Sequence, residues 1–270
     1  MSLFAFPPWL RQNDPMLITS LHNERVKLAR ALQTQAKARR REGRIALEGA
    51  RLVCDACQRG CRPDFVLFDP AAADEAALAA VRALGSEPLP ASAEVMRHIS
   101  ATQQPQGIVG VFPLPRPALP AALTRLLLLD GLRDPGNLGT ILRTAAAAGV
   151  QAVILSPDCA DPYNPKALRA GMGAHFRIPV VERNWPDIAA VCAGLTVYLA
   201  DARGDVRYDR ADWSRPWALI IGGEAHGAGA AAAGIASRRV SIPMAAETES
   251  LNAAAAAAVL LFEAAQRGGR

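Results

Sequence analysis

The feature that most constrains the fold is a set of four continuous apolar runs in the C-terminal half of the chain. They read Leu126–Asp130, Ala152–Leu155, Leu195–Leu199 and Trp217–Ile221, with helical stretches between them. Strands that are apolar without alternation are typical of parallel sheets covered by helices on both faces. We therefore predict a parallel α/β domain that ends in an Ala-rich helix from Leu251 to about Gln266.

The N-terminal part of the chain predicts a second, smaller α/β unit. A helical pattern spans residues 21 to 42, and an Ala-rich helix is expected over 71 to 84. Short strands are expected at residues 44–49, 65–68 and 108–112, with a helix after the first of them.

A run of prolines separates the two parts of the chain. Four prolines fall within residues 113 to 120, and such a run forms an extended, semi-rigid connector. We therefore predict an N-terminal domain over 16–112, a linker over 113–121 and a C-terminal domain over 122–270. Residues 1–15 are Pro-rich and aperiodic, which favours a disordered extension or an alternative start.

Basic residues are concentrated near the N-terminus. The net charge is +5 and the pI is near 9.2, which suits an anionic partner. Between residues 25 and 44 only two acids accompany eight basic residues, namely Arg25, Lys27, Arg30, Lys37, Arg39, Arg40, Arg41 and Arg44. This segment either contacts a phosphate backbone or is a solvated helix face.

The five cysteines have no disulfide-framework spacing, so a reducing cytoplasm is expected. Cys54, Cys57 and Cys61 lie at i, i+3 and i+7, which marks one face of a buried helix. Because no fourth ligand follows nearby, we predict no metal site. The chain has no signal-like opening and no apolar run of about 18 residues, so we predict no membrane segment.

Three glycine- or asparagine-containing segments follow predicted strands or precede the last helix. Residues 130–143, DGLRDPGNLGTILR, form a glycine-bounded turn that suits either an anion or a plain tight turn. Residues 222–227, GGEAHG, let a ligand approach the backbone closely, and His226 in this loop is interpreted as incidental. In the third segment, residues 242–252, Ser250 or Asn252 is expected to cap the last helix, which is compatible with function.

Together the three segments resemble the motifs of the SpoU/TrmH family, RNA 2′-O-ribose methyltransferases of the SPOUT superfamily. The matching patterns are Asn137-x-Gly139-x-x-x-Arg143, Gly222-x-Glu224-x-x-Gly227 and Ser250-Leu251-Asn252. Residues 166–179 are similar to the intervening segment of the family, and the resemblance covers roughly 122 to 266. Residues 46–53 and 102–108 resemble a substrate-binding domain with a ribosomal-protein RNA-binding fold.

This resemblance implies an α/β fold, namely a parallel-sheet SPOUT domain with a C-terminal trefoil knot, preceded by a small RNA-binding domain. It also implies the cofactor S-adenosyl-L-methionine, held in a bent shape and largely by backbone groups. The implied cofactor-binding residues are Leu199, Ala200, Gly222, Gly223, Glu224, Gly227, Ile242, Met244, Leu251 and Asn252. No metal is required.

The resemblance also implies the catalytic set. Arg143 either accepts the proton of a ribose 2′-hydroxyl or fixes the adjacent phosphate, and arginine is normally protonated. Asn137 and Glu224 are expected to orient Arg143 or the ribose, and Ser250 and Asn252 to position the substrate. In the family a homodimer completes the site, which brings Arg143 of one subunit toward the cofactor of the other.

The predicted function is therefore S-adenosylmethionine-dependent 2′-O-ribose methylation of RNA, with the basic segment from Arg25 to Arg44 helping to bind it. Ribosomal RNA is favoured, and transfer RNA remains open. A non-catalytic RNA-binding protein on the same fold is a second hypothesis. A dinucleotide-binding α/β enzyme is a third, disfavoured because the Gly-x-Gly-x-x-Gly turn is missing.

Overall fold

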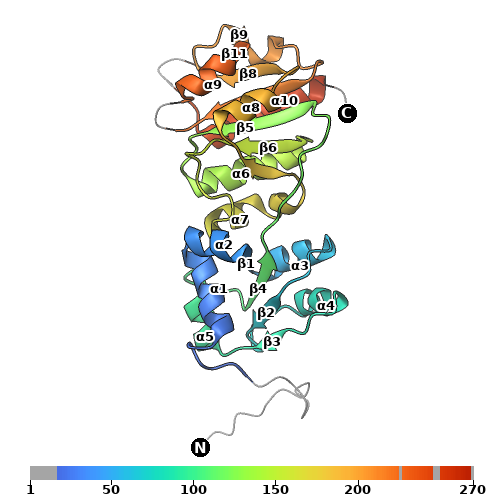
Figure 1. Cartoon of the computed structure of the whole chain (residues 1–270), viewed down its shortest axis with the longest axis vertical. Coiled ribbons are helices and arrows are strands. Elements are labelled where there is room, and N and C mark those ends of the chain that lie inside the picture. The colour runs from blue at the N-terminus through green and yellow to red at the C-terminus, as the bar shows by residue number, and fades with distance from the viewer. Residues whose placement is uncertain (1–16, 225–226, 246–249, 269–270) are drawn as a thin grey trace, which may run out of the picture. The chain divides into compact units, whose positions relative to one another are not determined.

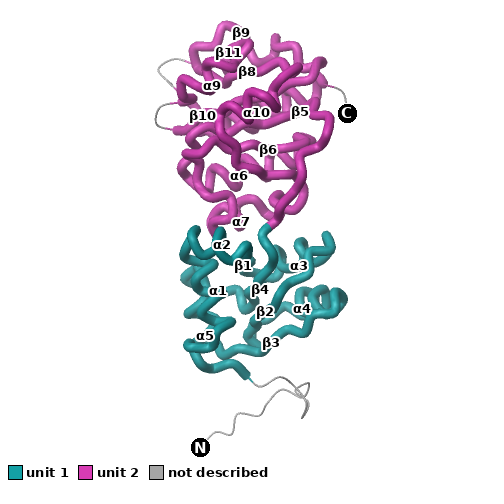
Figure 2. The backbone as a smooth tube through the Cα atoms, viewed as in Figure 1, with its two compact units in different colours: residues 1–114 teal, residues 115–270 magenta. Residues whose placement is uncertain are grey.

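The computed structural model of the chain describes residues 17–224, 227–245 and 250–268. The chain divides into two compact units, residues 1–114 and 115–270 (Figure 2). The boundary falls inside the proline-rich segment. The predicted disordered extension over residues 1–15 and the loop residue His226 lie outside the described residues.

Unit 1 is built on a four-stranded sheet with the order β1-β4-β2-β3 (Figure 1). These strands are β1 (Arg44–Glu48), β2 (Phe65–Phe68), β3 (Leu89–Pro90) and β4 (Ile108–Pro113). β4 runs antiparallel to both β1 and β2, and β3 is parallel to β2. The sheet of unit 1 is therefore mixed.

Helices cover the sheet of unit 1. They are α1 (Glu24–Thr34), α2 (Ala36–Glu42), α3 (Ala50–Gln58), α4 (Glu75–Ala83) and α5 (Ala93–Ile99). α1 and α5 contribute Val26, Leu32 and Val95 to a buried cluster that also contains Val109 and Val111 of β4. The helix predicted over 21–42 is two helices, because the backbone of Gln35 is extended (φ −129°, ψ 114°) and ends α1.

Unit 2 contains a seven-stranded sheet with the order β7-β6-β5-β10-β8-β11-β9. The strands are β5 (Arg125–Asp130), β6 (Ala152–Leu155), β7 (Val180–Glu182), β8 (Thr196–Ala200), β9 (Val206–Arg207), β10 (Trp217–Gly222) and β11 (Arg238–Ser241). All neighbouring strands are parallel, which confirms the predicted parallel α/β domain. β7, β9 and β11 have only two to four residues and were not predicted.

Both faces of the unit 2 sheet are covered, which explains the apolar runs. On β5, Leu127 and Leu129 enter one buried cluster, and Leu126 and Leu128 enter another on the opposite face. The first cluster includes residues of α6 (Pro135–Ala147) and α10 (Ala253–Arg267), and the second includes residues of α8 (Trp185–Val191) and α9 (Ala230–Ile235). The remaining helix, α7 (Pro165–Gly171), packs against α6.

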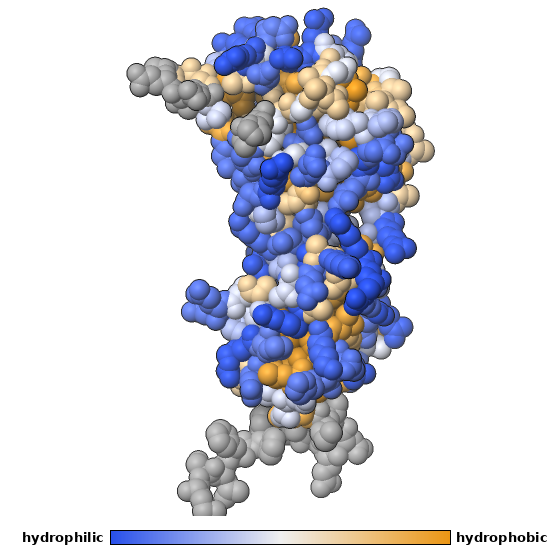
Figure 3. Space-filling model, turned by 60° about the vertical axis from the view of Figure 1, so that its left-hand side comes forward, coloured by the Kyte–Doolittle hydropathy of each residue, from blue (hydrophilic) through white to orange (hydrophobic). Residues whose placement is uncertain are grey.

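The sequence predicted no membrane segment. None of the helices in the described part of the chain is both long and apolar enough to cross a membrane. Hydrophilic side chains occupy much of the face drawn in Figure 3, with hydrophobic ones between them, as is usual for folded units. The C-terminal trefoil knot stays a prediction.

Candidate active site

The three sequence motifs lie at the carboxyl edge of the unit 2 sheet. β10 pairs with β5 on one side and with β8 on the other, and all three strands are parallel. The loops that follow them therefore leave the sheet at the same edge, where open α/β sheets bind ligands. The first motif follows β5 and the second follows β10, so the sheet brings them together.

The first motif begins α6 with an internal cap. The Asp134 carboxylate accepts a hydrogen bond of 2.8 Å from the backbone N–H of Asn137, and Pro135 occupies the first turn. Lys166 Nζ lies 2.7 Å from Asp134 Oδ2, and this hydrogen bond is the main reason that the pKa of Asp134 is lowered. The first turn of α6 is therefore capped by a side chain of its own motif.

The second motif needs glycine because backbone segments meet there. A Cβ on Gly222 would lie 2.3 Å from the backbone N of Ala228, and a Cβ on Gly223 would lie 2.3 Å from the carbonyl O of Gly131. Asp130 is 8% exposed and accepts a 2.7 Å hydrogen bond from the backbone N–H of Gly229. Gly222 and Gly223 thus allow close packing between segments of the chain's own backbone. The sequence had suggested only that these glycines let a ligand approach the backbone.

A chain of hydrogen bonds links all three motifs. Asn137 Nδ2 donates to Glu224 Oε1 at 2.7 Å, and Asn252 Nδ2 donates to Asn137 Oδ1 at 3.2 Å. Asn252 is the N-cap residue of α10, and its Oδ1 accepts a hydrogen bond from the backbone N–H of Ala254 at 2.9 Å. Side chains far apart in the sequence are therefore held in one arrangement, whose central member is Asn137.

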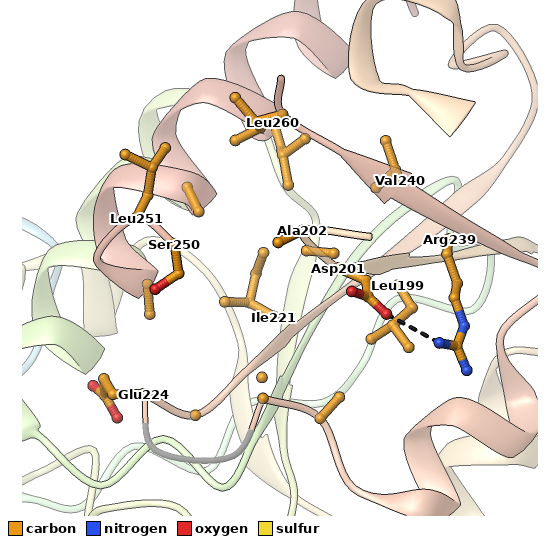
Figure 4. A pocket seen from close by; sticks show the side chains of 18 of the residues that line it. Leu199, Asp201, Ala202, Ile221, Glu224, Arg239, Val240, Ser250, Leu251 and Leu260 are labelled. Atoms are coloured by element: carbon orange, nitrogen blue, oxygen red, sulfur yellow. Dashed lines mark hydrogen bonds and ion pairs between the residues drawn. The ribbon is translucent and has the colours of Figure 1, made fainter. Parts of the chain in front are cut away.

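A cavity of about 610 Å³ lies beside this hydrogen-bond chain (Figure 4). Its walls come from the ends of β8 and β10, the segment after β11 and the first half of α10. All ten residues predicted to hold a cofactor line it, together with Ser250. Its volume falls within the range of pockets for drug-sized ligands, about 300 to 1,000 Å³. The apolar side chains of Ile221, Leu251 and Leu260 line the cavity, and the Glu224 carboxylate lies at one end of it (Figure 4).

Arg239 is a lining residue that the sequence did not single out. Its Nη1 lies 3.0 Å from Asp201 Oδ2, and both residues line the cavity (Figure 4). Arg239 belongs to β11, a strand of four residues whose sequence, RRVS, gives no apolar signal. Asp201 directly follows β8 and falls in the stretch from Leu199 to Ala202 that the family resemblance implies near the cofactor.

Arg143 is separate from the cavity of its own chain. It is exposed on α6 and is absent from the cavity lining, and its side chain makes no hydrogen bond or ion pair with any other described residue. Glu224, Ser250 and Asn252 therefore line the cavity, and Asn137 is hydrogen-bonded to Glu224 and Asn252. Arg143 neither lines the cavity nor joins these hydrogen bonds.

The eight basic residues of the N-terminal segment do not form one exposed set. The prediction that Arg39 contacts RNA needs correction. This residue is only 3% exposed, and its Nη1 donates to the carbonyl O of Leu32 at 2.5 Å. Lys27, Arg41 and Arg44 lie within 2.8 Å of carboxylates, and Arg30 donates to the carbonyl O of Ser100 at 3.1 Å. The exposed residues of the segment are Arg25, Lys27, Lys37, Arg40 and Arg41.

Comparison with known families matches residues 124–262 to the SpoU rRNA Methylase family. The chain belongs to the SpoU rRNA methylase family. The predicted membership is thereby confirmed, and the hypothesis of a dinucleotide-binding enzyme is set aside. Residues 23–110, which lie in unit 1, match a separate model, the MRM3-like substrate binding domain.

Relatives of this SpoU-family chain match along most of its length. The 23S rRNA (guanosine(2553)-2′-O)-methyltransferase RlmP of Bacillus subtilis is 34% identical, over 91% of this chain and 97% of its own. The mitochondrial rRNA methyltransferase 3 of Mus musculus is also 34% identical, over 83% of this chain and 68% of its own. The two units therefore occur together in these relatives.

Solved structures give the same result. The AdoMet-bound rRNA methyltransferase from Sinorhizobium meliloti has a TM-score of 0.82 and 34% identity, covering 93% of this chain and 97% of its own. The SpoU methyltransferase AviRb from Streptomyces viridochromogenes, in complex with AdoMet, has a TM-score of 0.82 and 29% identity, covering 90% of this chain and 97% of its own. The SpoU fold is therefore established for this chain.

Proposed function

We propose that this SpoU-family enzyme transfers the methyl group of S-adenosyl-L-methionine to a ribose 2′-hydroxyl of ribosomal RNA. The observation that carries the proposal is the hydrogen-bond chain from Glu224 through Asn137 to Asn252 at the edge of the cavity. Two relatives of similar length and fold are named as rRNA methyltransferases, and one of these names specifies the 2′-O position. These names favour ribosomal RNA over transfer RNA.

The cavity fits S-adenosylmethionine in size and in chemistry. The carboxylate of Glu224 suits a cation, whereas that of Asp201 is already paired with Arg239, and the apolar wall around Leu251 and Leu260 suits an adenine ring. Residues that would hold it through backbone groups are Leu199, Ala200, Gly222, Gly223, Gly227, Ile242 and Met244. When bound, its sulfonium supplies an electrophilic methyl group with a neutral leaving group.

The residues at the cavity edge orient the nucleophile. A ribose hydroxyl must lie in line with the methyl group, and such positioning is worth orders of magnitude in rate. The amide of Asn137 is hydrogen-bonded to both Glu224 and Asn252, so it keeps these two side chains in position beside the bound ribose. Ser250 and Asn252 lie beside the cavity, where they position the ribose.

Arg143 completes the site from a second subunit. It is exposed and lies outside the cavity of its own chain, although its helix α6 packs against α10. Leu251, Val259 and Phe262, on or beside α10, are 40%, 37% and 46% exposed. Exposed apolar side chains at helical spacing favour an interface. We therefore propose a homodimer in which Arg143 fixes the phosphate or polarises the hydroxyl at the partner's cavity.

Unit 1 supplies the RNA contact. In this proposal residues 16–112 bind the substrate, residues 113–121 form the linker and residues 122–270 carry out catalysis. The exposed basic side chains of Arg25, Lys37, Arg40 and Arg41 provide a sequence-independent attraction to phosphate. All five cysteines are free thiols, which is compatible with the cytoplasm as the working compartment.

The proposal is tested with the purified full-length protein. Calorimetric titration should detect S-adenosylmethionine and not NAD. With labelled cofactor, the protein should transfer methyl groups to deproteinised ribosomal RNA from a strain lacking the gene, and far less to transfer RNA from that strain. Cofactor binding without transfer to either RNA would favour the non-catalytic alternative, and transfer to transfer RNA alone would replace the substrate.

A further inference from the structure

One end of the cavity in unit 2 carries a cation that takes no part in the hydrogen-bond chain of the three motifs. Among the described residues that line the cavity, the charged ones are Asp201, Glu224 and Arg239, so Arg239 is the only cation of this lining. Glu224 is hydrogen-bonded to Asn137, whereas Arg239 and Asp201 lie on the other side of the cavity (Figure 4). The cavity therefore has a reacting end and a separate charged end.

The loop after β8 holds Asp201 in place. The Asp201 carboxylate accepts a hydrogen bond of 2.9 Å from the backbone N–H of Arg203, and the backbone N–H of Gly204 donates to the carbonyl O of Asp201 at 2.9 Å. Ser241 Oγ donates to the carbonyl O of Gly204 at 2.9 Å. A Cβ on Gly204 would lie 2.9 Å from the carbonyl O of Arg239, so the loop packs closely against β11, the strand that carries this arginine.

The Asp201 carboxylate fixes one nitrogen of Arg239 and leaves the rest of the guanidinium available. Arg239 Nη1 lies 3.0 Å from Asp201 Oδ2, and Nε and Nη2 have no hydrogen-bond or ion-pair partner among the described residues. The side chains of Arg239 and Asp201 are 55% and 27% exposed, and an ion pair this open to solvent adds little to stability. It does orient the guanidinium in advance, which reduces the entropy lost when a ligand binds.

We propose that Arg239 binds the carboxylate in the methionine portion of S-adenosylmethionine. That carboxylate is the only anionic group of the cofactor, and α-carboxyl groups are ionised at neutral pH. A guanidinium binds a carboxylate through two parallel N–H···O hydrogen bonds, which are stronger than those between neutral groups. Asp201 is then a positioning residue, because it acts through Arg239. This inference rests on the proposed function, which supplies the cofactor, and it adds the residue that recognises its amino-acid end.

The position of Arg239 favours the cofactor over an RNA phosphate as its ligand. Its neighbour on β11, Arg238, is also exposed but does not line the cavity, because successive side chains of a strand point to opposite faces. The apolar wall around Leu251 and Leu260 suits the adenine ring, and the methyl group reacts near Glu224. The charged end therefore remains for the methionine carboxylate.

The test uses two ligands that differ in one group. Decarboxylated S-adenosylmethionine keeps the adenosine, the sulfonium and the amine of the cofactor and lacks only the carboxylate. Calorimetric titration of the full-length protein, without RNA, gives a dissociation constant for each ligand. The single variants are R239Q, R239K and the matched control R238Q, which removes a neighbouring exposed arginine from the same strand.

The unaltered protein and R238Q should bind S-adenosylmethionine at least about tenfold more tightly than the decarboxylated ligand, and R239Q should bind the two within about twofold of each other. R239K should keep part of the preference, because lysine retains the charge but not the two parallel hydrogen bonds. The double variant D201N/R239Q should lack the preference too. Its loss in R239Q is then not explained by repulsion from an unpaired Asp201 carboxylate.

A preference in R239Q equal to that in R238Q would overturn the proposal, and so would a preference that returns in the double variant. If an unchanged preference came with weaker binding of ribosomal RNA by R239Q, Arg239 would contact phosphate instead. Because the titrations contain no RNA, their outcome is independent of methyl transfer to ribosomal RNA by the unaltered protein, which tests the proposed function separately.

Discussion

At the scale of single residues, Asn137 is the side chain that connects the three motifs. Its amide is shared between Glu224 of the second motif and Asn252 of the third. Sequence patterns identified all three residues, but no pattern gives the pairing between them, because the pairing depends on how β5 and β10 are placed in the sheet. The residue types were thus predictable and their hydrogen bonds were not.

Replacing Asn137 by Ala should slow methyl transfer about 100-fold, because the site loses the group that aligns Glu224 with Asn252. Affinity for S-adenosylmethionine should change by less than about threefold, since Asn137 does not line the cavity, and alanine is a good helix former. Single-turnover kinetics and calorimetry measure the two effects. T140A alters an exposed residue of the same helix and should behave like the unaltered protein. An unchanged rate in N137A would contradict the assigned role.

His175 gives the protein a pH-dependent stability. It is 2% exposed, its Nε2 lies 2.8 Å from the carbonyl O of Pro162, and burial lowers its pKa from 6.5 to about 4. Between these values the unfolded chain takes up a proton that the folded chain refuses. The free energy of unfolding should therefore fall as the pH drops from 6.5 toward 4, by roughly 3 kcal/mol at most from this group.

Denaturant unfolding of the unaltered protein and of H175Q at pH 8, 6.5, 5.5 and 4.5 measures this contribution. The difference in unfolding free energy between the two proteins should be constant above pH 6.5 and should shift below it in favour of the variant. A difference that stays constant down to pH 4.5 would show that His175 does not titrate in the predicted window.

At the scale of elements, the strands of the unit 2 sheet that lie in continuous apolar runs were predictable, and the strands without such a run were not. Continuous apolar runs predicted β5, β6, β8 and β10, because both faces of these strands are covered. β9 and β11 have two and four residues, and their sequences VR and RRVS follow no apolar pattern. The burial of Arg39 was also missed, because a long side chain in a basic run gives no sign of which way it points.

The packing of α6 on α7 explains the glycine of the first motif. A Cβ on Gly139 would lie 2.3 Å from the carbonyl O of Ala167 and 2.9 Å from the backbone N of Gly171. G139A should therefore lower the free energy of unfolding by about 1–3 kcal/mol, measured by calorimetry or denaturant. The control is G234A in α9, where a Cβ has nothing within 4 Å, so it should be neutral or slightly stabilising. Equal stability of the two variants would refute this role for Gly139.

At the scale of the whole molecule, the active site that we propose is shared between two chains. The cavity and Arg143 belong to the same unit, yet Arg143 does not line the cavity. A sequence identifies both, but the distance between them within one subunit is a property of the folded chain. The family resemblance supplied the expectation that a second subunit brings Arg143 to the cofactor.

If the proposed dimer forms through α10, replacing Phe262 by Glu should convert it to a monomer and abolish most methyl transfer, because a charge then lies among the exposed apolar residues of this helix. Sedimentation velocity and the transfer assay measure the two effects on one preparation. The matched variant L17E changes an apolar residue of similar exposure in unit 1 and should remain a dimer. A monomeric F262E protein with full activity would rule out a shared site.

Ribose methylation in ribosomal RNA can be mapped by mass spectrometry in a deletion strain and in its parent. A 2′-O-methyl mark present in the parent should be missing from the deletion strain. That mark should return when the gene is restored and stay absent when the restored gene carries Asn137→Ala. Identical maps of ribosomal RNA from the two strains would contradict the claim that this chain methylates it.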